Sequence, residues 1–385
     1  MRVLLVWPAA GRLTSISVRY ERYARGFRAL GCDPVTVCLP AAAEGYDEPV
    51  AVAPDESALR DPDFYRALGA DAAVVVTWLG LPDVVAALKA AGLWVVSLAD
   101  SDGRVGVRAH PGATFARAVG QHPAWGTKLR AARYWATLFV GGPGEQDRPV
   151  LASAAAADRV VVCSPGAVAH LRRFFDSYRR PDLGEKVVSV PYPTDECHLT
   201  GPVPAARADR VVAIGRWEDP QKAAGVLARA AARHRAARGQ TEVLVFGPNG
   251  GRWFGPGGQS DRVAYMGVRP PEEIAAALRT SRALVLPSRW ESGPIVLSEA
   301  LAAGCSVVGT HAVPAVVSAC AEGPFGTVAR TGSAAGLATA IRDEMAAWDR
   351  GERDPTAIAA HWRPRFDPAA VCRALLAGCP AGVPA

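Results

Sequence analysis

The sequence contains few lysines and no long apolar run, and both absences restrict what the protein can be. Only four of the 43 basic residues are lysines, at positions 89, 128, 186 and 222. Because arginine is used freely elsewhere, a position that retains lysine is a better candidate for function than usual. No apolar run approaches the roughly 18 residues of a membrane-spanning helix, and the N-terminal apolar stretch is too short for a secretory signal. We therefore expect a cytoplasmic protein.

Other missing patterns exclude further classes. The eight cysteines form no C-x-x-C pair and have no histidine at metal-ligand spacing, so we expect free thiols and no metal site. No dense basic run carries interleaved aromatic residues, which argues against a nucleic-acid partner. The net charge of +6 suits an anionic small ligand and at most a peripheral contact with a membrane. Neither a P-loop nor a G-x-G-x-x-G pattern is present.

What the sequence does contain is an alternation of strand and helix patterns. Residues 2–8 form a continuous apolar run typical of a strand buried on both faces. Residues 17–30 have helical spacing that ends at Gly31, and residues 34–40 return to a strand. This order is a βαβ unit, the seed of a parallel sheet. We predict that it repeats, with strands at 71–78, 93–100, 159–165 and 186–193 and helices at 82–91, 113–140 and 167–178.

The alternation starts again after a polar segment at 195–208 that has no periodicity. The fold class is therefore α/β, with two Rossmann-like βαβ domains, residues 1–198 and 199–366, that face each other across a cleft. Open parallel sheets bind ligands at the carboxyl ends of their strands, so we expect the site in that cleft. In the second domain we predict strands at 210–215, 241–247, 262–267, 283–288 and 305–310, and helices at 223–238, 271–279 and 295–303.

One segment of the second domain has the features of an anion site. A buried strand ends at Ser288, and a helix begins at Pro294. Proline is favoured in a first helical turn because its missing N–H would have no partner there. The amides of Ile295, Val296 and Leu297 are then expected to be free at the positive end of the helix dipole, where phosphate binds readily.

Two carboxylates flank this anion site. Glu291 lies in the loop before the helix, and Glu299 lies about one turn inside it. Carboxylates are poor partners for phosphate, but they accept hydrogen bonds from hydroxyl groups. A nucleoside diphosphate sugar fits this arrangement, because it carries a ribose at one end of a pyrophosphate and a hexose at the other.

The order of residues 287–308, P-S-x-x-E…E-A-x-x-x-G-x-x-V-V, resembles the E-x7-E signature of the GT-B glycosyltransferases of the family 4 type. The resemblance implies that Glu291 contacts hydroxyls of the donor sugar and that Glu299 contacts the ribose diol. It also implies sugar transfer with retention of the anomeric configuration, without a metal or another cofactor. A C-terminal helix at 367–385 would pack back on the first, acceptor-binding domain.

A second segment strengthens the resemblance. AIGRWEDPQKAAGV is similar to the family's G-R-x(n)-K-G element, which implies that Arg216 and Lys222, after Gly215, contact the donor diphosphate. A guanidinium and an ammonium at the carboxyl end of a strand would neutralise phosphate charge and the charge that develops on the leaving group. The segment departs from the family in one place, since Ala223 replaces the glycine that follows the lysine.

Further site residues complete the hypothesis. Asp100, Asp102 and His110 follow the carboxyl end of a first-domain strand and are candidates to position an acceptor. Asp100-Ser101-Asp102 formally spells D-x-D, but it lies away from the predicted diphosphate contacts, and we assign no metal to it. The predicted catalytic residues are Arg216, Lys222, Glu291 and Asp100; the donor-binding residues are Glu299, Gly215, Gly293, Ile295, Val296, Gly267, Val268 and Arg12; the acceptor-side residues are Asp102 and His110.

We therefore predict a glycosyltransferase whose donor is linked to UDP or GDP and whose acceptor is a small secondary metabolite or a glycan. A nucleotide-sugar 2-epimerase of the same fold is one alternative, but it needs grouped acid and base residues that the sequence does not assign. A non-catalytic sugar-nucleotide-binding subunit is another, and the complete donor set argues against it. Pro294 departs from the pattern of the family and removes one possible amide donor. We therefore expect the predicted sugar pocket to differ from that of the family near this residue.

Overall fold

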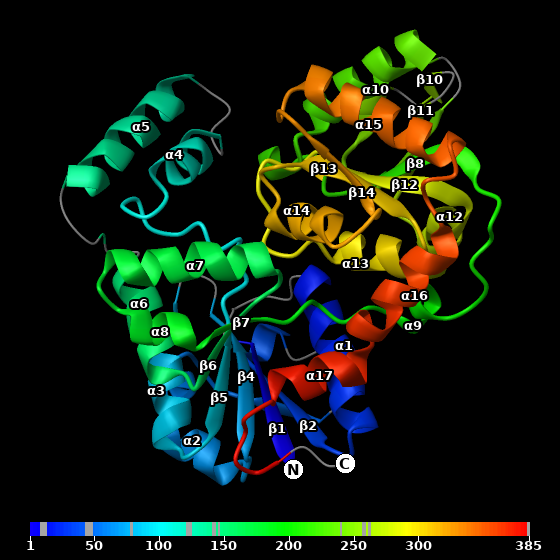
Figure 1. Cartoon of the computed structure of the whole chain (residues 1–385). Coiled ribbons are helices and arrows are strands. Elements are labelled where there is room, and N and C mark those ends of the chain that lie inside the picture. Colours follow the sequence, from blue (N-terminus) through cyan, green and yellow to red (C-terminus); the bar gives the residue numbers. More distant parts are fainter. Residues whose placement is uncertain are drawn as a thin grey trace. The chain divides into compact units, whose positions relative to one another are not determined.

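The computed structural model describes residues 1–7, 14–42, 49–77, 80–120, 125–140, 144, 147–238, 241–255, 259–260 and 263–382. The chain folds into two compact units, each built around one seven-stranded sheet (Figure 1). The first unit contains Met1–Thr114, Tyr134–Pro193 and Asp367–Ala385, and the second contains Phe115–Arg133 and Thr194–Phe366. The prediction of two Rossmann-like α/β domains is confirmed.

The first unit has the strand order β3-β2-β1-β4-β5-β6-β7, and all neighbouring strands are parallel. Every residue of β4 is buried, as expected for a strand that helices cover on both faces. The strands are β1 (Arg2–Trp7), β2 (Asp33–Cys38), β3 (Val50–Val52), β4 (Ala72–Val76), β5 (Trp94–Leu98), β6 (Arg159–Val162) and β7 (Val187–Ser189). The helices are α1 (Thr14–Ala29), η1 (Pro40–Ala42), η2 (Ala58–Arg60), α2 (Pro62–Ala67), α3 (Pro82–Ala90), α6 (Asp147–Ala156), α7 (Pro165–Ser177), α8 (Pro181–Glu185) and α17 (Pro368–Leu375), while α4 (Pro111–Gly120) and α5 (Trp125–Val140) span the division between the units.

The second unit has the strand order β10-β11-β9-β8-β12-β13-β14, parallel except for the antiparallel pair β10 and β11. The strands are β8 (Ala208–Ile214), β9 (Glu242–Phe246), β10 (Gln259–Ser260), β11 (Val263–Gly267), β12 (Ser281–Leu286), β13 (Ser306–Thr310) and β14 (Gly326–Ala329). The helices are α9 (Glu196–Leu199), η3 (Pro220–Lys222), α10 (Ala224–Arg238), α11 (Gly251–Phe254), α12 (Pro271–Thr280), α13 (Ile295–Ala302), α14 (Pro314–Ala321), α15 (Ala334–Asp349) and α16 (Pro355–Phe366).

Side chains that alternate along β8 build two cores in the second unit. Val211 and Ala213 pack with α10 and α15 on one face of the sheet. Val212, between them in sequence, packs with α12, α13, α14 and α16 on the other face. Because successive side chains of a strand point to opposite faces, a continuous apolar run is what a two-sided core requires.

The strand order fixes where the second sheet can hold a ligand. Reading outward from β8, the chain continues to β9 on one side and to β12 on the other. This reversal is the topological switch point of the sheet, and in parallel α/β sheets ligands bind beyond the strand ends at that point. The loops that follow β8 and β12 carry Arg216, Lys222 and Glu291, which are three of the four predicted catalytic residues.

Some elements differ from the prediction. The second unit begins at Thr194, a few residues before the predicted boundary, and residues 115–133 group with it. The two helical stretches expected between about residues 113 and 140 are confirmed as α4 and α5. The structure also contains elements that were not predicted from the sequence, among them the short strand β3 and the elements α14, β14, α15 and α16. No helix among the described residues is long and apolar enough to cross a membrane.

Helix α17 lies beside α1 in the first unit (Figure 1). Their close approach depends on Gly26, because a Cβ at this position would lie 2.3 Å from the carbonyl oxygen of Pro368 and 2.6 Å from Sγ of Cys372. The Cys372 thiol also donates to the carbonyl of Tyr23 at 3.3 Å. The C-terminal helix is therefore held by a backbone-to-backbone contact that leaves no room for a side chain.

We predict that Gly26→Ala destabilises the first unit by about 1–3 kcal/mol, because the added methyl group overpacks a contact with backbone atoms. Chemical unfolding monitored by far-UV circular dichroism measures the change. Gly112→Ala is the matched control, since Gly112 also lies in a helix and its Cβ would meet nothing within 4 Å. Equal stability of the two variants would contradict the proposed contact.

Candidate functional site

The segment after β8 is held tightly against the end of β9. The amide of Gly215 donates to the carbonyl of Phe246 at 3.1 Å, and the buried indole of Trp217 donates to the same carbonyl at 2.8 Å. Gly247 has a φ of +112°, and a Cβ there would lie only 2.0 Å from the carbonyl oxygen of Gly215. Glycine at 247 thus allows the two strand ends to approach, and Gly215 is a structural anchor for the residues that follow it.

A short turn then presents Lys222. The side chain of Asp219 accepts a hydrogen bond from the amide of Gln221 at 2.9 Å and caps η3, and Pro220 occupies the first position of this turn. The turn ends at Ala223, which has a φ of +50°. This left-handed conformation favours glycine, the residue of the G-R-x(n)-K-G pattern at this position, so Ala223 is strained.

The centre of the site is the carboxylate of Glu291. Lys222 Nζ lies 2.5 Å from its Oε1, and the hydroxyl of Ser288 donates to the same oxygen at 2.7 Å. Gln221 Nε2 donates to Oε2 at 3.0 Å. Both ionised side chains are sheltered, with exposures of 16% for Lys222 and 7% for Glu291. A buried carboxylate is stable only when it is paired and hydrogen-bonded in this way.

This geometry limits what Glu291 can still bind. A carboxylate offers about four lone-pair positions, and the Lys222, Ser288 and Gln221 bonds occupy three of them. The position that remains is on Oε2, so Glu291 can accept one further hydroxyl group. The predicted contact with a donor sugar remains a prediction, and the pairing of Glu291 with Lys222 is a feature that the motifs alone do not indicate.

Arg216 differs from Lys222 in its surroundings. Its side chain is 53% exposed, and its guanidinium lies 3.2 Å from the carboxylate of Asp219, three residues ahead in the sequence. Exposed pairs of this kind contribute little to stability. Arg216 is therefore an exposed cation at the carboxyl end of β8, with most of its donors available to an anion.

Helix α13 begins four residues after Glu291, and Gly293 directly precedes its N-cap residue. Pro294 occupies the N-cap position, with no capping side chain, and its carbonyl accepts the amide of Leu297 at 2.9 Å. The expectation that Leu297 offers a free amide is therefore wrong. The amides of Ile295 and Val296 remain as the candidates for binding phosphate at the positive end of the helix.

Glu299 is buried within α13 and has a neighbour that the sequence does not indicate. Its Oε1 lies 4.0 Å from Nε2 of His198, whose side chain is 1% exposed. His198 belongs to the short helix α9, inside the polar segment predicted to be a domain linker. The polar segment therefore places a buried histidine near the carboxylate that is predicted to bind the ribose.

The predicted nucleobase contacts lie at the end of β11. Gly267 has a φ of +67°, and its carbonyl accepts the amide of Gly247 at 2.8 Å. The Val268 side chain is 70% exposed, which leaves an apolar surface at this strand end. The phenol of Tyr265 donates to the carbonyl of Gly247 at 2.8 Å and accepts from the amide of Gly250 at 3.0 Å. These bonds fix the backbone that would meet a base.

The predicted acceptor-side residues lie in the first unit, and their hydrogen bonds stay within that unit. Tyr192 donates a hydrogen bond to Asp100, which has a φ of +32°. Asp102 is buried, and its Oδ1 accepts the amide of Arg104 at 3.1 Å. His110 Nε2 lies 2.8 Å from the carbonyl oxygen of His170. Burial lowers the pKa of His110, and these bonds hold the loop after β5 in place.

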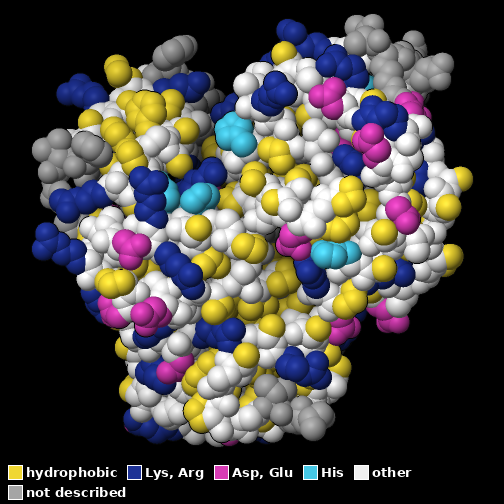
Figure 2. Space-filling model, viewed as in Figure 1, with side chains coloured by type: hydrophobic (Ala, Val, Ile, Leu, Met, Phe, Trp, Pro, Cys, Tyr) yellow, Lys and Arg dark blue, Asp and Glu magenta, His cyan; other side chains and the backbone are white. Residues whose placement is uncertain are grey.

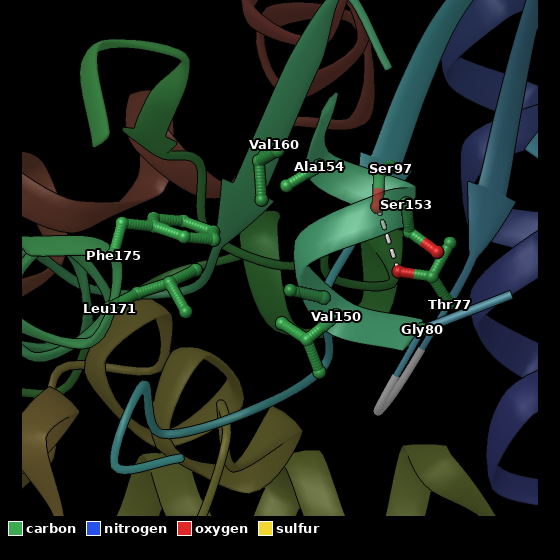
Figure 3. Close-up of a pocket in the computed structure, with 10 residues that line it drawn as sticks. Thr77, Gly80, Ser97, Val150, Ser153, Ala154, Val160, Leu171 and Phe175 are labelled. Carbon is green, nitrogen blue, oxygen red and sulfur yellow. Dashed lines mark hydrogen bonds between the residues drawn. The ribbon is translucent and has the colours of Figure 1, made fainter. Parts of the chain in front are cut away.

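Two further observations bear on the first unit. Arg12 lies outside the described residues. A cavity of about 10 Å³, enough for one water molecule, lies between β4, β5, α6 and α7 (Figure 3). Thr77 and Ser97 line it and share a hydrogen bond of 2.7 Å. It is too small for a sugar, so it is not a substrate site.

Within the part of the chain that the structure describes, neither a metal-binding cluster nor a charged patch on the visible face adds a further candidate site. Among the described residues, no group of three or more His, Cys, Asp or Glu side chains is placed to hold a metal ion. Figure 2 shows Lys and Arg side chains scattered over the visible face of the molecule, interspersed with Asp and Glu. On this visible face the basic side chains therefore form no continuous patch.

Comparison with known proteins shows that part of the chain is similar to glycosyltransferases. Residues 208–346 match the family Glycosyl transferases group 1. A D-inositol 3-phosphate glycosyltransferase from Nocardia farcinica is 30% identical over 182 residues, which are 44% of this chain and 40% of that protein. The chain thus spans less than half the length of this curated relative.

Solved structures share the fold over nearly the whole chain. The Anabaena protein HepE in complex with UDP has a TM-score of 0.66 at 17% identity, and the match covers 98% of this chain and 99% of that chain. A sucrose-phosphate synthase from Thermosynechococcus elongatus has a TM-score of 0.59 at 18% identity, covering 97% and 96%. The chain has the fold of the GT-B glycosyltransferases, and residues 208–346 of its second unit match the group 1 glycosyltransferase family.

We predict strong coupling between Lys222 and Glu291 in the folded state. Glu291→Gln or Lys222→Met alone should each cost about 3–5 kcal/mol, because each leaves a sheltered charge without its partner. The double variant should be less damaging than the sum, with a coupling free energy of about 1–3 kcal/mol in a double-mutant cycle by denaturant unfolding.

The matched control for this cycle is the ion pair Arg350 and Glu352, whose side chains are 58% and 49% exposed. Its cycle should show no resolvable coupling, because exposed pairs are screened by water and salt. If the Lys222 and Glu291 cycle also gave additive changes, the two groups would not form a sheltered pair in solution.

We predict that the first unit becomes less stable in mild acid. Burial lowers the pKa of His110 and of His170 below the value of about 6.5 expected for the unfolded chain. Between the folded pKa and about 6.5 the unfolded chain binds more protons, so the free energy of unfolding falls as the pH falls through this window. Urea unfolding of His110→Gln should show a weaker pH dependence, whereas the exposed His311→Gln should behave as wild type.

Proposed function

We propose that this protein is a glycosyltransferase that moves a sugar from a nucleoside diphosphate sugar to an acceptor hydroxyl, with retention of the anomeric configuration. One observation carries the proposal. Within the group 1 domain, the carboxyl ends of the switch-point strands β8 and β12 bring together Lys222, Glu291 and Ser288, with Arg216 exposed beside them. These are the charge and hydrogen-bonding groups that a sugar diphosphate requires.

The donor is proposed to be linked to UDP or GDP. The Anabaena protein HepE, which shares the fold, has been solved with UDP and with UDP-glucose, and this supports UDP. In this chain the diphosphate would bind Arg216 and the amides of Ile295 and Val296, because guanidinium groups and helix N-termini both favour phosphate. Glu299 would accept hydrogen bonds from the ribose diol, and the exposed strand end at Val268 would meet the base.

The chemistry would depend on the charge of the leaving group. As the bond between the sugar and the diphosphate breaks, negative charge increases on the diphosphate oxygen. Arg216, Lys222 and the α13 amides would stabilise that charge without reorganising, which is the main way that enzymes lower such barriers. We therefore propose catalysis without a metal or another cofactor, and the free position on Glu291 Oε2 would orient one hydroxyl of the sugar.

The acceptor is proposed to be a small hydroxyl-bearing molecule. The name of the Nocardia relative, an inositol phosphate glycosyltransferase, supports a small acceptor over a polymer. Asp100, Asp102 and His110 are its proposed contacts, since they lie at the carboxyl end of the first-unit strand β5. Tyr192 would fix Asp100 through its hydrogen bond.

A panel of UDP-, GDP-, dTDP- and ADP-sugars tests the donor by calorimetry, followed by incubation with and without a mixture of small acceptors. We expect one donor to bind and to release its nucleoside diphosphate only when an acceptor is present. Conversion of the sugar nucleotide alone would indicate an epimerase, and failure of every nucleotide to bind would overturn the proposal.

We predict that Glu299→Gln weakens binding of the nucleoside diphosphate on the order of 10-fold or more, because an amide replaces a charged acceptor for the ribose hydroxyls. Calorimetry with the free diphosphate measures this directly. Glu273→Gln is the control, since Glu273 is an exposed glutamate of α12 whose ion pair with Arg269 is long, at 3.7 Å. Equal affinity of both variants would remove Glu299 from the ribose site.

A further inference from the structure

We propose that Gln221 is a positioning residue that fixes the ammonium group of Lys222 for the transfer reaction. The inference rests on the proposed glycosyltransferase function and goes beyond it, because Gln221 occupies an unspecified position of the G-R-x(n)-K-G segment and has no assigned role there. It would not touch the substrate. It would act by holding the Glu291 carboxylate to which Lys222 is bound.

Gln221 joins the two loops of the site through three hydrogen bonds, and a fourth bond fixes it within its own turn. Its side-chain amide donates to the carbonyl of Trp290 at 2.8 Å and to Oε2 of Glu291 at 3.0 Å. Its backbone carbonyl accepts the amide of Arg289 at 2.9 Å, and its own amide donates to Asp219 Oδ1 at 2.9 Å. One residue therefore bonds the turn after β8 to the loop after β12 through both its backbone and its side chain.

The contribution of Gln221 differs from that of the other two donors. Lys222 and Ser288 both bond to Oε1 of Glu291, so neither of them fixes the rotation of the carboxylate plane. Gln221 bonds to the opposite oxygen, Oε2, and it is anchored to the backbone of the same loop through Trp290. Without this bond the carboxylate can rotate, and the ammonium group that follows it loses a defined position.

This loss would affect the transition state more than donor binding. Exposed Arg216 and the α13 amides are proposed to hold the ground-state diphosphate, and the bonds that fix Gln221 run instead to Glu291, Trp290, Arg289 and Asp219. Lys222 would matter most when charge increases on the leaving oxygen. A displacement of about 1 Å in such a group can lower the rate on the order of 100-fold. The expected signature is therefore a lower kcat with little change in donor KM.

The experiment compares wild type with Gln221→Met and Gln221→Glu under steady-state conditions. Methionine has a similar volume but cannot donate, so Gln221→Met should lower kcat about 10- to 100-fold while donor KM changes less than about 3-fold. Unchanged kcat, or a loss that appears only in KM, would overturn the positioning role.

Gln221→Glu adds a readout that a purely structural role would not show. The introduced carboxyl group would lie next to Glu291, and two adjacent carboxylates share a proton because like charges raise the pKa. Below that pKa the shared proton replaces the amide donor, and above it the two groups repel. The kcat of this variant, relative to wild type, should therefore be near normal in acid and fall as the pH rises. Ala232→Glu, which adds the same charge at an exposed position of α10, should show no such fall.

Labelling of lysines distinguishes failure of this inference from failure of the proposed function. The chain has only four lysines, so the reaction of each with an amine reagent can be followed by mass spectrometry, with Lys89, Lys128 and Lys186 as internal references. Faster labelling of Lys222 in Gln221→Met supports the fixed position even if no donor is ever turned over. Labelling equal to wild type overturns it, whatever the activity.

Discussion

The site depends on one interaction, the burial of the Glu291 carboxylate between two loops. Removing an ionised carboxylate from water is costly, and hydrogen bonds together with a counter-ion offset this cost. Here Lys222, Ser288 and Gln221 supply both. The first and third of these residues lie about 70 positions before Glu291 in the sequence, so the carboxylate is a tertiary link as well as a ligand candidate.

The topology makes this link possible. Strands β8 and β12 are neighbours in the sheet although β9 to β11 lie between them in the sequence, and the loops beyond their carboxyl ends therefore meet. The turn that presents Lys222 is held at its start by Trp217 and Gly215, which both bond to the end of β9. The end of β13 contributes as well, since Thr310 donates to the carbonyl of Ser288 at 2.9 Å. Four adjacent strand ends thus determine where one ammonium group lies.

Much of the fold could be predicted from the sequence, because strands buried on both faces appear as continuous apolar runs such as the one that forms β4. The order of motifs also located Arg216, Lys222 and Glu291 at strand ends. Their mutual arrangement could not be predicted, since the pairing of Lys222 with Glu291 depends on strand order, which is not a local property. The same holds for Gln221 and His198, which occupy no specified motif position and acquire importance only through the groups that folding brings beside them.

The pairing changes how the charge of the site should be understood. Two cations near a diphosphate suggest a net positive pocket, but the charge of Lys222 is balanced by Glu291 at 2.5 Å. The pair is therefore an oriented dipole, and in the proposed mechanism it would be fixed before the donor binds. Net attraction for the diphosphate would then come from Arg216 and from the amides of Ile295 and Val296. Binding and catalysis would accordingly depend on different groups, with the exposed arginine capturing the anion and the buried pair stabilising the charge that forms later.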